Sequence, residues 1–173
     1  MNEALLVLDV QNVMFMPEYN LHNAEVVLRN IQLLINHARD KGIPIIYIQH
    51  TGEVGGLLEE YSEPWEIHPL IQPASDDIVI EKMSWDSFYE TNLKEKLESL
   101  GVKKLIICGM QTQFCVDTVC RTAYSHGYHS LLAKDAHSTF DTDLLEASTI
   151  ISHHNDILGG RFVTLKSTSE IIA

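Results

Sequence analysis

Three residues with reactive side chains stand where runs of apolar residues end. Asp9 closes a run that begins at Leu5, Lys82 closes a second run, and Cys115 follows soon after a third. A thiol can attack a carbonyl carbon, a carboxylate can take up the thiol proton, and an ammonium can favour the thiolate by its charge. Together the three residue types indicate covalent hydrolysis by a cysteine nucleophile.

Of the three cysteines, Cys115 is the one whose position fits a nucleophile. Thr112 is a favoured residue for capping a helix N-terminus, which predicts that Cys115 lies in the first helical turn. There, free N–H groups and the positive helix end would lower the pKa of the thiol and hold an oxyanion. Cys108 lies within an apolar strand pattern and Cys120 on the apolar stripe of a helix, so we predict that both are core residues.

Asp9 and Lys82 each have a second interpretation. An aspartate at the end of a strand commonly caps a turn, and a lysine there is commonly solvated. In the functional interpretation, Asp9 is the general base for the thiol, and Lys82 pairs with Asp9 and favours the thiolate. The argument rests on the coincidence of Asp9, Lys82 and Cys115, because the carboxyl ends of parallel strands meet at one edge of a sheet.

Short apolar runs alternate with amphipathic ones and define the elements that would position these residues. The strands are expected at residues 5–10, 44–49, 77–82, 104–110, 130–135 and 162–165. Most are apolar at consecutive positions, which is typical of a parallel sheet buried on both faces. Helical patterns between them end near glycines, at Gly42, Gly101, Gly127 and Gly159. The order predicts an α/β fold, a three-layer αβα domain with a doubly wound, mostly parallel six-stranded sheet.

One connection breaks the alternation of strands and helices. Residues 51–75 contain three glycines and three prolines and show no helical period. A long irregular segment inside a compact domain is usually functional, so we expect this loop to border the site. The 173 residues otherwise fit one domain, residues 1–173.

Composition limits the partners and the compartment. The net charge of −12 argues against nucleic-acid binding, and no apolar run approaches the roughly 18 residues of a membrane span. The N-terminus lacks the basic start of a signal peptide. An odd number of cysteines without a CxxC pair argues against disulfides and structural zinc, so we expect a cytoplasmic protein. As its partner we expect a small-molecule substrate.

Several segments, in order along nearly the whole chain, resemble the isochorismatase-like cysteine hydrolases. The most specific is Gly-x-x-Thr-x-x-Cys-Val, which ends at Val116. The others are 8–12, Glu81-Lys82 with Ser87-Phe88, 91–93 and 134–136. The family includes nicotinamidases, N-carbamoylsarcosine amidohydrolase and isochorismatase itself.

The resemblance implies a catalytic triad of Asp9, Lys82 and Cys115. In it Cys115 forms a thioester, and Asp9 passes the proton to the leaving amine. The family also implies a cis peptide at Met110–Gln111, an oxyanion hole built from the backbone N–H groups of Gln111 and Cys115, and a homo-oligomer. True isochorismatases lack the nucleophilic cysteine. We therefore expect a hydrolase that cleaves the C–N bond of a small amide or carbamoyl-type substrate.

One departure from the family concerns metal binding. Nicotinamidases carry an Asp-x-His cluster just after strand two, whereas this chain has His50 without the aspartate. We therefore expect no catalytic metal and no cofactor, and nicotinamidase activity is in doubt. His50 and His68 border the long loop and could meet there, although hydrogen-bonded or surface histidines are commoner.

Gln11, Phe15 and Trp85 follow Asp9 and Lys82 closely, so we expect them to line the substrate pocket.

The sequence leaves other functions open. Isochorismatase-type hydrolysis remains an alternative. A flavodoxin-like binding domain is a weaker one, because the turn after strand one lacks the glycines or hydroxyls that hold phosphate. A phospho-accepting receiver domain conflicts with a lysine, rather than an aspartate, at the end of strand three.

Overall fold

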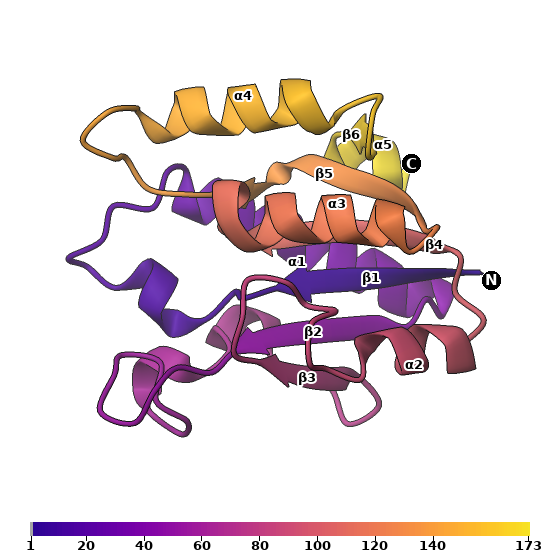
Figure 1. The fold of residues 1–173 in the computed structure, drawn as a ribbon, viewed down its shortest axis with the longest axis horizontal. Coiled ribbons are helices and arrows are strands. Elements are labelled where there is room, and N and C mark those ends of the chain that lie inside the picture. Colours follow the sequence, from indigo (N-terminus) through magenta and orange to yellow (C-terminus); the bar gives the residue numbers. More distant parts are fainter. Residues whose placement is uncertain (1) are drawn as a thin grey trace.

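Six strands form one sheet in the order β3-β2-β1-β4-β5-β6 in the computed structural model, which describes residues 2–173 (Figure 1). Every neighbouring pair is parallel, which confirms the predicted sheet. The strands are β1 (Glu3–Leu8), β2 (Ile45–His50), β3 (Ile78–Lys82), β4 (Lys104–Met110), β5 (His129–Ser138) and β6 (Thr164–Lys166).

Helices cover both faces of the sheet and make the three layers that the sequence predicted. Leu5 and Val7 of β1 share one apolar core with α1 (Ala24–Lys41) and α5 (Thr168–Ile172). Leu6 and Leu8 point to the opposite face, where they share a second core with α2 (Leu93–Ser99), α3 (Asp117–Ser125) and α4 (Ala147–Leu158). Because side chains alternate between the two faces along β1, this strand contributes to two separate cores.

The winding direction changes between β1 and β4. From β1 the chain moves outward through α1 to β2 and then to β3, and it returns through α2 to β4, beside β1. From β4 it moves outward in the other direction, through α3 and α4. The helices that follow β1 and β4 lie on opposite faces of the sheet, and open α/β sheets bind their ligands at such a point.

The carboxyl ends of two strands differ from the predicted bounds by two residues or more. β1 ends at Leu8 instead of residue 10, because Asp9 adopts a φ of +49° that interrupts the extended backbone. β5 continues past residue 135, because it pairs again with β4 after a register shift, with His137 opposite Gly109 and Ser138 opposite Met110.

The C-terminal part also departs from expectation. Leu144 and Leu145 fit the apolar helical pattern that ends near Gly159, but they are exposed residues before α4. Asp141 Oδ1 accepts the N–H of Ala147 at the start of this helix. Gly159 has a φ of −62° and does not close α4 in a left-handed conformation. Position 159 has no room for a side chain, because a Cβ there would lie 2.9 Å from the backbone carbonyl oxygen of Asn155. α5, which we did not predict, begins with a capping box.

The connection from β2 to β3 is irregular, as predicted. It contains only two short 3-10 segments, Glu63–Trp65 and Pro69–Ile71. Gln49 of β2 and Gln11, which follows β1, hold it in place by donating to the Trp65 carbonyl at 3.0 and 2.7 Å. Within the connection, the Trp65 indole donates to Thr51 Oγ1 at 2.9 Å. None of the helices within residues 2–173 has the length and apolarity to cross a membrane.

The close approach of β4 to β1 gives a stability prediction. Gly109 has a φ of +120°, and a Cβ there would lie 2.1 Å from the Leu8 carbonyl oxygen. We expect Gly109→Ala to lower the free energy of unfolding by about 3 kcal/mol or more, because backbone strain and overpacking each cost roughly 1–3 kcal/mol. The measurement is urea unfolding. In the control Gly127→Ala, φ is +84° in open space, so strain alone should cost about 1–2 kcal/mol. Equal losses in the two variants would contradict the packing argument.

Candidate active site

The carboxyl edge of the sheet brings Asp9, Lys82 and Cys115 together. Asp9 directly follows β1, Lys82 is the last residue of β3, and Cys115 lies in a π-helical turn, Thr112–Val116, between β4 and α3. All three side chains are buried, with exposures of 1%, 2% and 8%. Ionisable groups this deeply buried need close partners.

The Lys82 ammonium has four close neighbours, which include both of the other groups. Its Nζ lies 2.9 Å from Asp9 Oδ2, 3.2 Å from Cys115 Sγ, 2.8 Å from the Ser84 carbonyl oxygen and 3.2 Å from His50 Nδ1. An ammonium has three N–H groups for these four neighbours. Asp9 is the oppositely charged neighbour of the ammonium, and it also lies close enough to Cys115 to raise the pKa of the thiol. The carboxylate is therefore placed where it can take up the thiol proton.

The pKa of Cys115 is raised to about 12, which corrects our prediction of a lowered value. Burial is the largest cause, the Asp9 carboxylate adds to it, and the Lys82 ammonium offsets only part. Burial lowers the pKa of Lys82, but the charges of Asp9 and of the Cys115 thiolate outweigh it, so the ammonium pKa lies above its ordinary value. The resting site therefore holds a neutral thiol beside a charged lysine, and the nucleophile requires a base.

Thr112 does not cap a helix, which corrects a second expectation. Its hydroxyl is paired with His137 Nδ1 at 2.9 Å, and His137 Nε2 is paired with Asn155 Oδ1 at 3.0 Å. Burial lowers the pKa of His137 to about 4, so the ring is neutral. The Asn155 carbonyl can only accept, so Nε2 donates to it and Nδ1 accepts from Thr112. These two hydrogen bonds connect the turn that carries Cys115 to β5 and α4.

A cavity of about 170 Å³ lies beside the thiol. Its lining residues are Asp9, Met14, His50, Leu58, Trp85, Gln111 and Cys115. Catalytic-site candidates and apolar side chains thus share one small space, which suits a small ligand with few polar atoms. A larger cavity of about 690 Å³ lies next to it and includes Lys82 and Ser84 in its wall.

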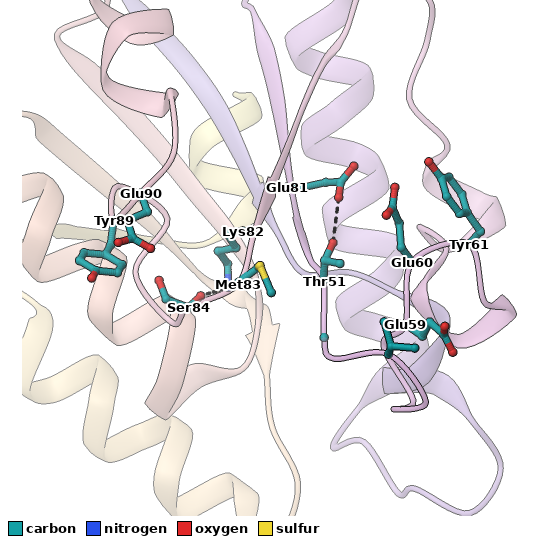
Figure 2. Close-up of a pocket in the computed structure, with 12 residues that line it drawn as sticks. Thr51, Glu59, Glu60, Tyr61, Glu81, Lys82, Met83, Ser84, Tyr89 and Glu90 are labelled. Atoms are coloured by element: carbon teal, nitrogen blue, oxygen red, sulfur yellow. Dashed lines mark hydrogen bonds between the residues drawn. The ribbon is translucent and has the colours of Figure 1, made fainter.

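The larger cavity is acidic (Figure 2). Four glutamates line it: Glu59 and Glu60 from the loop after β2, Glu81 from β3 and Glu90 from the segment after β3. Four carboxylates within the wall of one cavity repel an approaching anion. Cys115 is not among the residues that line this cavity, so we place the chemistry in the smaller one.

The side chains predicted for the substrate pocket lie in different places. Trp85 lines the small cavity and is 58% exposed. Phe15 packs against His68, with ring centroids 4.6 Å apart, and is not among the cavity residues. Gln11 is fully buried, and its amide binds the backbone of His50 and Trp65 instead of the cavity.

The peptide bond between Met110 and Gln111 is cis, as the resemblance implied. The Gln111 side chain lines the cavity, and its Oε1 accepts from the Thr139 hydroxyl at 3.2 Å. The oxyanion hole formed by the Gln111 and Cys115 N–H groups stays a prediction.

The residues at the position where nicotinamidases carry their metal cluster do not fit a metal. Within residues 2–173 no three histidine, cysteine or acidic side chains are grouped as ligands. His50 Nδ1 faces the Lys82 ammonium at 3.2 Å, so a cation bound there would meet a like charge. His68 turns its Nδ1 to the N–H of Leu70.

Comparison with known proteins places the chain in a family. Residues 3–151 match the family model described as the isochorismatase domain, so the chain belongs to the isochorismatase family and is a hydrolase of that family. It is 32% identical to the uncharacterized isochorismatase family protein YddQ of Bacillus subtilis (strain 168), over 99% of both chains. It is 30% identical to nicotinamidase 3 of Arabidopsis thaliana, over 84% of this chain and 77% of the relative. A crystal structure of an isochorismatase family protein matches with a TM-score of 0.90 at 37% identity, over 96% of this chain and 98% of the other.

The opposed charges beside the thiol predict opposite effects on its reactivity. Lys82→Gln removes the charge that lowers the pKa of Cys115, so alkylation by iodoacetamide at pH 9 should slow, tenfold for each unit of pKa gained. Asp9→Asn removes a charge that raises this pKa, so alkylation should accelerate. The adduct on Cys115 is quantified by peptide mass spectrometry, and thermal melting checks the fold.

The control for this experiment is Lys134→Ala, which removes a lysine paired only with Glu170 at the surface. It should leave the alkylation rate unchanged. Rate changes of the same sign in Lys82→Gln and Asp9→Asn would show that charge does not set the thiol pKa.

Proposed function

We propose that this hydrolase cleaves the C–N bond of a small amide or carbamoyl-type substrate through a thioester on Cys115. The observation that carries the proposal is the buried contact of Lys82 Nζ with Cys115 Sγ at 3.2 Å and with Asp9 Oδ2 at 2.9 Å, beside a cavity. A nucleophile, a carboxylate that can act as a base and a fixed positive charge meet there.

In the proposed acylation step, Sγ attacks the substrate carbonyl carbon while Asp9 takes the thiol proton. The carbonyl oxygen becomes an oxyanion, which the N–H groups of Gln111 and Cys115 would hold. When the oxyanion collapses, the C–N bond breaks and Asp9 returns the proton to the leaving amine. The acyl group remains on Cys115 as a thioester.

In the proposed deacylation step, water attacks the thioester carbonyl and Asp9 takes its proton. The C–S bond breaks, the product leaves as an acid, and Asp9 returns the proton to Sγ. Lys82 keeps its charge throughout, because its pKa is raised above the ordinary lysine value. Its role is to hold Asp9 and Sγ in place and to stabilise negative charge on either.

A relative supports the amide assignment over isochorismatase-type hydrolysis. Nicotinamidase 3 is named as an amidase and aligns with 84% of this chain. Isochorismate carries two carboxylates, and the acidic cavity beside the site would repel such a substrate. Neutral or cationic amides meet no such barrier.

The proposal is tested by intact-protein mass spectrometry after incubation with a panel of small amides and carbamoyl compounds. An acyl adduct should appear on Cys115, and Cys115→Ser should lose the adduct and turnover. Cys120→Ser is the matched control, because Cys120 lies on the fully buried face of α3, and it should retain turnover. Loss of turnover in a folded Cys120→Ser variant together with an active Cys115→Ser variant would refute the assignment of the nucleophile.

We further propose that the protein works as a homo-oligomer, with the loop after β2 near an interface. Large apolar side chains are exposed along this loop, at Val54, Leu57, Tyr61 and Leu70. Exposed apolar groups of this kind often mark protein interfaces. Sedimentation at micromolar concentration should give a mass of at least twice 19.6 kDa. A mass near the monomer value would contradict the proposal.

A reducing, cytoplasmic location is also proposed. Cys108, Cys115 and Cys120 are all free and buried, and the mechanism needs the Cys115 thiol in its reduced form.

A further inference from the structure

His50 is a half-buried group that the proposed mechanism does not use. It ends β2 and lies opposite Lys82 of β3 in the strand register. Gln11 fixes its backbone from both sides: the His50 N–H donates to Gln11 Oε1, and Gln11 Nε2 donates to the His50 carbonyl, each at 2.9 Å. A buried glutamine whose amide serves this backbone leaves His50 little freedom to move.

The neighbouring lysine determines where the imidazole carries its proton. Lys82 Nζ lies 3.2 Å from His50 Nδ1, and an ammonium can only donate. Nδ1 is therefore the acceptor, and a neutral ring carries its hydrogen on Nε2. Burial, followed by the Lys82 charge, lowers the pKa of His50, so the ring is neutral at physiological pH.

The Nε2–H group faces no protein partner. The hydrogen bonds among residues 2–173 use only Nδ1 of this ring, and the ring lines the same cavity as Cys115. Much of the remaining wall is apolar, from Met14, Leu58 and Trp85. The hydrogen bond received at Nδ1 also polarises the ring and strengthens Nε2–H as a donor.

We propose that His50 binds substrate by donating a hydrogen bond from Nε2 to an acceptor atom outside the scissile amide. This role of His50 rests on the proposed function and adds a substrate class to it. The class is small amides that carry a second acceptor, such as a ring nitrogen, an ether or a carbonyl. The donor is neutral and its position is fixed, so it selects for the place of an acceptor atom and not for charge.

The test measures binding and requires no turnover. Benzamide and the three isomeric pyridinecarboxamides differ only in whether, and where, the ring presents a nitrogen acceptor. Each compound is titrated in chelator-treated protein, and its dissociation constant is obtained from protection of Cys115 against iodoacetamide. In the wild type, at least one pyridinecarboxamide should bind about tenfold more tightly than benzamide, which is the effect of one added hydrogen bond.

Two variants distinguish the roles of the two ring nitrogens of His50. His50→Asn keeps an acceptor near the Nδ1 position for Lys82 but has no donor at the Nε2 position, so the preference should disappear. His50→Gln places an amide N–H near the Nε2 position, so the preference should be largely restored. His68→Asn is the matched control, because His68 packs against Phe15 outside the cavity, and it should keep the wild-type preference.

The outcomes decide between the claims. Equal protection by all four compounds in the wild type, absence of protection included, would overturn the role of His50, as would a preference that survives in a folded His50→Asn variant. A protein that shows the preference but hydrolyses no amide would leave this inference standing and would refute the proposed function.

Discussion

The burial of one positive charge organises this edge of the protein. The Lys82 ammonium is 2% exposed, and a buried charge is tolerated only when opposite charge and hydrogen-bond acceptors surround it. Asp9 provides the charge, and Ser84, His50 and Cys115 provide the acceptors. Asp9 also lies beside the Cys115 thiol, whose pKa its charge raises. The same arrangement that satisfies the lysine therefore places the carboxylate where it can take up the thiol proton.

The parallel sheet is what makes this arrangement possible. The register of β2 and β3 sets His50 opposite Lys82, and the register of β1 and β4 sets Leu8 opposite Gly109, so that Asp9 and the turn carrying Cys115 leave the sheet side by side. The glycine at 109 allows β4 to approach β1 more closely than any side chain would permit. The sheet therefore positions the three groups through backbone pairing, and the loops add the walls of the cavity.

Much of this could be predicted from the sequence, and the errors have physical causes. Continuous apolar runs predicted the strands, and strand ends in a parallel sheet share one edge, so the meeting of Asp9, Lys82 and Cys115 followed from local patterns. The pKa of Cys115 could not follow from them, because it depends on how far burial and a nearby carboxylate outweigh one ammonium in three dimensions. A helix-cap argument at Thr112 failed for a related reason, since the hydroxyl had a buried partner from a distant strand.

That partner, His137, shows which signal was missed. Its role required β5 to run beyond residue 135 into a polar stretch, where hydrophobic periodicity gives no strand signal. Gln11 was misjudged in the same way: its position after β1 suggested a pocket, but its amide completes the hydrogen bonding of another backbone segment. Polar residues near a site are assigned correctly only when the partners of every buried donor and acceptor are known.

The charges of the site explain why its resting state has a protonated thiol. Asp9 and Lys82 sum to zero, and a free thiolate beside them would add an uncompensated negative charge in a buried place, which is what the raised pKa of Cys115 expresses. If the proton moves from Sγ to Asp9 as the carbonyl is attacked, the site avoids that charge: the carboxylate is neutralised, and the negative charge passes through sulfur to the oxyanion, still beside Lys82. Within the proposed mechanism, a base next to the nucleophile is therefore an electrostatic requirement of burial as much as a means of moving a proton.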